Sequence, residues 1–103
     1  MLYQQGDVLI KKISGIPRDA KKVEAEGERF ILARGEATGH HHSVPAIDTE
    51  LFSCPDGLIL HCIAEVQIEH QEHKPITLPI GDYQIIPVRE YNHFDEEARR
   101  VVD

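Results

Sequence analysis

The sequence predicts an all-β domain, either a small barrel or a sandwich of about eight short strands. Its apolar residues occur in short runs that Gly, Pro and Asp interrupt, which is the rhythm of strands joined by turns. Along the longest run, apolar and polar residues alternate, as they do in a strand with one buried face. No segment before Asn92 repeats its apolar residues with the period of a helix.

The expected strands follow one another with short connections. In chain order they cover residues 7–13, 22–25, 29–33, 50–54, 58–69, 75–79, 83–91 and 99–102. Pro55, Asp56 and Gly57 lie between two apolar runs and predict a hairpin. Pro87 predicts an edge strand or a bulge, because proline donates no hydrogen bond to a neighbouring strand. Asn92 predicts the cap of a short helical turn over residues 95–98.

Length, charge and cysteine count narrow the class of protein. A chain of 103 residues has the size of one domain, so residues 1–103 are expected to form a single unit. The net charge of −7, with histidine neutral, argues against nucleic-acid and anionic membrane partners. No signal peptide or membrane-spanning run is visible, which predicts a cytoplasmic protein. Cys54 and Cys62, the only cysteines, are therefore expected to be free thiols.

Two of the seven histidines form an H-x-H pair, His40 and His42. On an extended chain, residues two apart point to the same face, so both imidazoles can converge on one metal ion. The intervening His41 then points to the opposite face. The alternative is that all three histidines are simply solvated in a polar loop.

A second pair, His70 and His73, follows the longest apolar run. His70 continues the even-numbered series that carries Cys62, Val66 and Ile68, so it is expected at the rim of the buried face. His73 comes in the next turn, where it can fold back beside His70. The metal site predicted from the sequence therefore consists of His40, His42, His70 and His73.

Other polar residues have both a functional and an ordinary interpretation. Asp7 follows Gly6 and is either a site carboxylate or a turn residue. Glu36 precedes the H-x-H pair and is a ligand, a general base or a solvated carboxylate. His61 is expected at the surface and His93 in a turn.

Two short motifs resemble the cupin superfamily, whose members are small β-barrels that often hold a divalent metal. One is the H-x-H pair after a glycine-bearing loop, and the other is the turn Pro79-Ile80-Gly81. The cupin pattern has a glutamate soon after H-x-H, where this chain has Ala46 and Ile47, and a histidine after the turn, where it has Gln84.

Most of the chain is also similar to a family of small, uncharacterised bacterial proteins. The resemblance rests on four segments, Gln5-Gly6-Asp7-Val8, Ala37-Thr38-Gly39-His40-His41-His42, Leu78-Pro79-Ile80-Gly81-Asp82-Tyr83 and Arg89-Glu90-Tyr91. It implies a bacterial cytosolic domain and brings no activity with it.

The function expected from the residues is binding of a divalent transition metal through histidines. Imidazole suits Zn, Ni, Fe or Cu, and the sequence does not choose among them. A closed four-histidine site would favour a structural or storage role, whereas an open three-ligand site would permit hydrolysis or oxygen chemistry. The alternative is a metal-free interaction module that binds a protein partner or a second copy of the chain.

Overall fold

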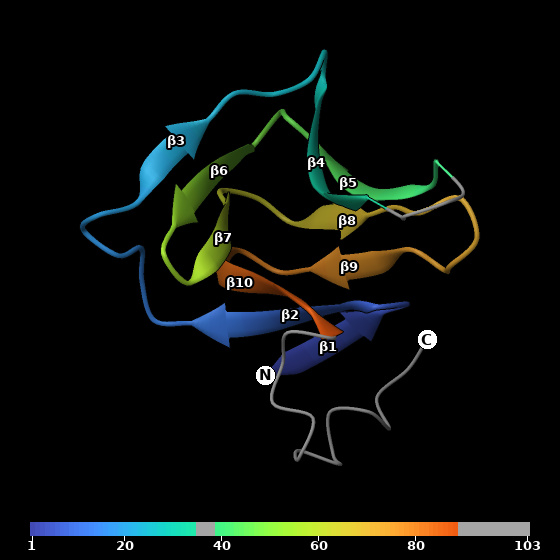
Figure 1. The fold of residues 1–103 in the computed structure, drawn as a ribbon, viewed down its shortest axis with the longest axis horizontal. Coiled ribbons are helices and arrows are strands. Elements are labelled where there is room, and N and C mark those ends of the chain that lie inside the picture. Colours follow the sequence, from blue (N-terminus) through green and yellow to red (C-terminus); the bar gives the residue numbers. More distant parts are fainter. Residues whose placement is uncertain (35–38, 89–103) are drawn as a thin grey trace.

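The computed structural model describes residues 1–34 and 39–88, and this part of the chain is all-β (Figure 1). It contains no helix, so no described helix could cross a membrane. The described strands are β1 (Leu2–Gln5), β2 (Val8–Ile13), β3 (Lys21–Val23), β4 (Arg29–Arg34), β5 (His41–Pro45), β6 (Thr49–Cys54), β7 (Gly57–Cys62), β8 (Val66–Ile68), β9 (Ile76–Leu78) and β10 (Gly81–Pro87).

The strands form three antiparallel sheets. A six-stranded sheet has the order β1-β2-β10-β7-β6-β3, and two small sheets consist of β4-β5 and β8-β9. The small sheets are joined where Ser43 and Glu69 exchange two backbone hydrogen bonds of 2.9 and 2.8 Å. Together they form a second layer against the large sheet, so the described part resembles a sandwich and does not close into a barrel.

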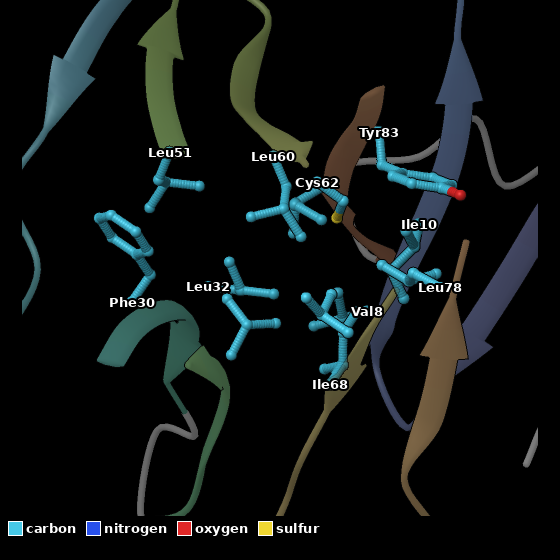
Figure 2. Packing of buried hydrophobic residues seen from close by; sticks show 13 residues of the cluster. Val8, Ile10, Phe30, Leu32, Leu51, Leu60, Cys62, Ile68, Leu78 and Tyr83 are labelled. Carbon is cyan, nitrogen blue, oxygen red and sulfur yellow. The ribbon is translucent and has the colours of Figure 1, made fainter. Parts of the chain in front are cut away.

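The hydrophobic core lies between these layers (Figure 2). The large sheet contributes alternate residues of its central strands, and the two small sheets contribute their inward-facing side chains. Burial of this apolar surface is the main favourable contribution to folding. The core residues are Val8, Ile10, Phe30, Leu32, Val44, Leu51, Leu60, Cys62, Val66, Ile68, Leu78, Tyr83 and Ile85.

Two expectations about strands are corrected by the structure. The expected strand over residues 58–69 is broken, because β7 lies in the large sheet and β8 lies in a small one. Its alternation continues across the break, since Cys62, Val66 and Ile68 are all buried. Pro87 does not mark an edge, because β10 pairs with both β2 and β7. It is instead the last residue of β10, where a missing donor interrupts nothing.

The structure also bears on the expected hairpin, on strands that were not expected and on the C-terminal segment. The hairpin at Pro55 is confirmed, since Cys54 pairs with Gly57 across the turn. The structure adds β1 and β5, which were not among the strands expected from the sequence. The expected helical turn over residues 95–98 and the strand over 99–102 lie outside the described residues.

Candidate metal centre

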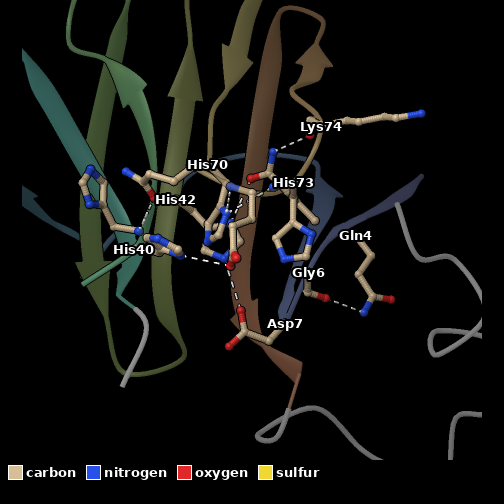
Figure 3. Close-up of polar contacts among 12 residues, drawn as sticks. Gln4, Gly6, Asp7, His40, His42, His70, His73 and Lys74 are labelled. Carbon is tan, nitrogen blue, oxygen red and sulfur yellow. Dashed lines mark hydrogen bonds and ion pairs between the residues drawn. The ribbon is translucent and has the colours of Figure 1, made fainter. Parts of the chain in front are cut away.

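All four histidines of the predicted site come together on one side of the second layer (Figure 3). His40 immediately precedes β5, and His42 lies within it. His70 and His73 belong to the loop that joins β8 to β9. The pairing of β5 with the end of β8 brings these two segments side by side.

The spacing of the rings is close to that of imidazoles around one ion. The ring centroid of His70 lies 5.7 Å from that of His40, 4.4 Å from that of His42 and 4.6 Å from that of His73. The centroids of His42 and His73 are 6.2 Å apart. Two imidazoles bound tetrahedrally to one metal through bonds of ~2.1 Å would have their centroids about 5 Å apart.

His42 is held in one tautomer by Gln5, which is fully buried. The Gln5 amide nitrogen donates hydrogen bonds to the carbonyls of Ile68 and Lys74, at 3.0 and 2.8 Å. The Gln5 amide oxygen is therefore the atom that faces His42 Nδ1 at 2.8 Å. Because that oxygen only accepts, His42 Nδ1 must donate, and in the neutral ring Nε2 then carries the lone pair.

The free side of His42 faces a carboxylate. His42 Nε2 lies 3.2 Å from Asp7 Oδ1, and the Asp7 side chain is 79% exposed whereas that of His42 is 3% exposed. Burial lowers the pKa of His42 below its usual value, although the hydrogen bond that the imidazolium form would donate from Nε2 to Asp7 opposes this shift. At neutral pH the imidazole is therefore favoured over the imidazolium, which suits a metal ligand.

Asp7 occupies the turn between β1 and β2, where Gln5 pairs with Val8. Gly6 has a positive φ of 58°, the conformation that glycine adopts most easily in a two-residue hairpin. Asp7 also lines a cavity of about 380 Å³, together with Val8, Leu32, Ala33, Arg34, Pro87 and Val88. Asp7 thus both contacts His42 and borders this cavity.

The ring of His70 is held by backbone groups, whereas that of His42 is held by the Gln5 side chain. Its Nδ1 accepts hydrogen bonds from the backbone N–H groups of Glu72 and His73, at 3.0 and 3.3 Å. The neutral ring therefore carries its proton on Nε2 in this arrangement. Burial and the neighbouring His73 and His40 lower the pKa of His70. To bind a metal through either ring nitrogen, the neutral His70 ring must give up these two backbone hydrogen bonds, because binding through Nε2 places the proton on Nδ1.

The remaining two histidines have neighbours that restrict their rings. His40 Nδ1 lies 3.0 Å from Glu72 Oε1, in a contact that leaves the His40 side chain 31% exposed. His73 lies against the turn at Gly6, because a Cβ added to Gly6 would approach His73 Nε2 to 2.4 Å. The absence of a side chain at Gly6 therefore makes room for His73.

Within residues 1–34 and 39–88, no three His, Cys, Asp or Glu side chains already converge as ligands of one ion. The hydrogen bonds explain this, since His70 Nδ1 is directed at the backbone and His40 Nδ1 at Glu72. The rings are gathered, but they would have to reorient before their nitrogens could bind one ion.

His41 lies apart from this cluster. It lines a separate cavity of about 370 Å³ together with Arg29, Ser43, Glu69, His70, Gln71 and Pro75. The expected alternation along the tripeptide is consistent with this placement, since His40 and His42 both contact His70 through their rings. His70 is the residue shared by the cluster and this cavity.

Other candidates from the sequence are separate from the cluster or undescribed. His61 Nδ1 pairs with Asp82 Oδ1 at 2.6 Å across β7 and β10. Cys54 and Cys62 are free thiols at opposite ends of the β6–β7 hairpin. Glu36, His93 and the segment Arg89-Glu90-Tyr91 lie outside the described residues.

Sequence reasoning gave Gln5 no role in the site. Glutamine before a turn has no distinctive pattern, and its role depends on carbonyls more than sixty residues away. Asp7 was a candidate on the basis of its residue type, but its position opposite His42 requires the fold.

The family described as DUF8820, a domain of unknown function, matches residues 4–87. These residues include the β1–β2 turn and all four histidines of the cluster. No curated protein and no solved structure matches the chain.

Proposed function

The chain belongs to the DUF8820 family, and from the geometry of its histidines we propose that it binds one divalent transition-metal ion through His40, His42, His70 and His73. The observation that carries this proposal is the gathering of four imidazole rings from two segments about thirty residues apart in sequence. Four of the six pairs of these rings have centroid separations of 4.4 to 6.2 Å, which bracket the value of about 5 Å that a shared ion requires.

The electrostatics of the cluster support the proposal. Burial lowers the pKa of His42 and of His70, so protons compete less with a metal at neutral pH. The net charge of −7 favours accumulation of cations around the chain. Zn, Ni, Fe and Cu all accept imidazole ligands, so the proposal names the class of metal and not the element.

The proposal includes no reaction. Ligation by four histidines alone would suit a structural or storage role, because it would leave no position of a tetrahedral ion for a substrate. We propose the cytoplasm as the compartment, since both cysteines are free thiols and reducing compartments keep thiols in that state.

Calorimetric titration of Zn²⁺ into tag-free protein at pH 7.5 tests the proposal. We expect one site, a loss of at least about tenfold in affinity for His42→Ala, equal to roughly 1.4 kcal/mol, and little change for His41→Ala. His41 is the matched control because it adjoins His42 in β5 and lines the cavity that Arg29 and Glu69 also line, where His70 is the one clustered histidine.

Because His42 is buried, its replacement is paired with His40→Ala, whose partly exposed side chain makes unfolding a lesser concern. Circular dichroism of each variant establishes that it is folded. No binding by the unmutated protein, or equal losses for His41→Ala and His42→Ala, would overturn the proposal. Absence of binding would leave the metal-free interaction module as the better hypothesis.

A further inference from the structure

We infer that Asp7 is an additional ligand of the metal, through its carboxylate, and that Gln5 is a positioning residue that makes His42 bind through Nε2. This inference rests on the proposed function and specifies the site more closely. It makes the site a mixed one, with imidazole nitrogen and carboxylate oxygen ligands, in place of a site of histidines alone.

The first step is the orientation of Gln5. Its amide is fixed because two backbone carbonyls, those of Ile68 and Lys74, accept from the same nitrogen. Its oxygen then accepts from His42 Nδ1 at 2.8 Å. Metal-bound histidines commonly donate their second ring nitrogen to an oxygen acceptor, which fixes the tautomer and the ring orientation. Gln5 provides that acceptor without requiring a metal.

His42 Nε2 faces the Asp7 carboxylate. In the neutral ring this atom is a lone-pair acceptor, and the atom opposite, Asp7 Oδ1, is also an acceptor. Two acceptors facing each other at 3.2 Å gain no hydrogen bond. A cation between them converts this contact into two favourable bonds.

The distance between His42 Nε2 and Asp7 Oδ1 also fits two ligands of one ion. Two ligand atoms that each lie about 2.1 Å from one ion are separated by roughly 3.0 Å in octahedral and 3.4 Å in tetrahedral geometry. The separation of 3.2 Å between His42 Nε2 and Asp7 Oδ1 falls within this range. The Asp7 side chain is exposed, so its carboxylate can adjust to the ion without disturbing the core.

The competing explanation is an ordinary ion pair between an imidazolium and a carboxylate. In that case His42 would donate from both nitrogens, and Asp7 would have no part in metal binding. The two explanations differ in the protonation of His42 Nε2 and in the effect of removing the Asp7 charge.

The test combines Zn²⁺ titration with nitrogen NMR of the histidine rings at pH 7.5. In the metal-free protein we expect His42 Nδ1 to be protonated and Nε2 to show the shift of an unprotonated nitrogen. Addition of Zn²⁺ should move the Nε2 resonance. We expect Asp7→Asn to lose at least tenfold in affinity, because its amide can donate to Nε2 and occupy the lone pair. Asp7→Glu, which keeps a carboxylate, should recover part of the loss.

Asp19→Asn is the control, because it makes the same change in charge at an exposed position beyond the far end of β2. For Gln5, the Gln5→Met variant should lose the single tautomer of His42, a spectroscopic change that loss of packing alone would not produce. If the unmutated protein binds Zn²⁺ and Asp7→Asn binds it equally well, the ligand role of Asp7 is wrong while the proposed function stands. If His42 carries a proton on Nε2 in the metal-free protein, its contact with Asp7 is the ordinary ion pair and the facing-acceptor argument for Asp7 is wrong. If His42 Nδ1 is unprotonated, the role of Gln5 is wrong, whether or not the Gln5→Met variant folds.

Discussion

Gly6 is the position at which one added methyl group should affect both the fold and the proposed metal site. An alanine there meets two penalties. The φ of +58° is unfavourable for a residue with a Cβ, by roughly 1–2 kcal/mol. The new Cβ would also lie 2.4 Å from His73 Nε2, so the ring must move by about 1 Å to restore ordinary contact.

These numbers predict the outcome of Gly6→Ala. The protein should lose about 1–2 kcal/mol of stability, which lowers Tm by roughly 4–16 °C for a domain of this size. Metal–ligand distances must be met to about 0.2 Å, so a displacement of about 1 Å should remove His73 from the site. We therefore expect Zn²⁺ affinity to fall at least about tenfold, measured by calorimetry beside thermal unfolding of the metal-free protein.

Two other glycines separate the two effects. Gly27 has a φ of +65° but nothing within 4 Å of an added Cβ, so Gly27→Ala should lower Tm and leave Zn²⁺ affinity unchanged. Gly15 has neither strain nor a close neighbour, so Gly15→Ala should change neither quantity. The reasoning is refuted if Gly6→Ala binds Zn²⁺ as tightly as Gly27→Ala does.

Three further predictions follow from the described contacts. Because the pKa of His42 is lowered in the fold, protons bind preferentially to the unfolded chain. The contribution of His42 to the free energy of unfolding should therefore be full above about pH 6.5 and fall as pH decreases below it. Denaturant unfolding of the metal-free protein from about pH 8 to about pH 5 should show this fall, and His42→Gln should make the dependence of stability on pH less steep. Burial raises the pKa of Cys62 to about 12, so iodoacetamide at pH 8 should modify Cys54 first and Cys62 only on unfolding, as read by mass spectrometry. His61→Ala removes the contact with Asp82 but touches none of the clustered histidines, and it should leave Zn²⁺ affinity within about twofold of the original value.

The strands that the sequence predicts well are those whose partners lie nearby in the chain. The β6–β7 hairpin follows from two apolar runs around Pro55, and its register agrees with that expectation. β1 was not predicted because only Leu2 and Tyr3 are apolar in it, while the polar Gln4 and Gln5 are buried. The break after Cys62 was not predicted because the alternation of buried residues continues unchanged while the chain passes from one layer to the other.

The candidate site, like the fold, could be predicted from the sequence only where its residues lie close together in the chain. The spacing of His40 and His42, and that of His70 and His73, is visible in the sequence. Their meeting depends on the two hydrogen bonds between Ser43 and Glu69, which nothing in the local sequence specifies. A single sequence predicts pairs of candidate ligands, and only the tertiary structure brings the pairs together.

The clustering of imidazoles contributes little to the stability of the metal-free protein. Burial lowers the pKa of His42 and of His70, and neighbouring imidazoles lower both further, His70 and His73 acting on His42, and His73 and His40 acting on His70. The opposed acceptors His42 Nε2 and Asp7 Oδ1 gain nothing while the ring is neutral. Because the unfolded chain does not hold these groups together, a metal that binds the folded form would stabilise it by about 2.7 kcal/mol at a concentration of 100 Kd. In the proposed site a metal would convert the opposed contact of His42 Nε2 with Asp7 Oδ1 into two bonds, and this gain must exceed the loss of the backbone hydrogen bonds to His70 Nδ1.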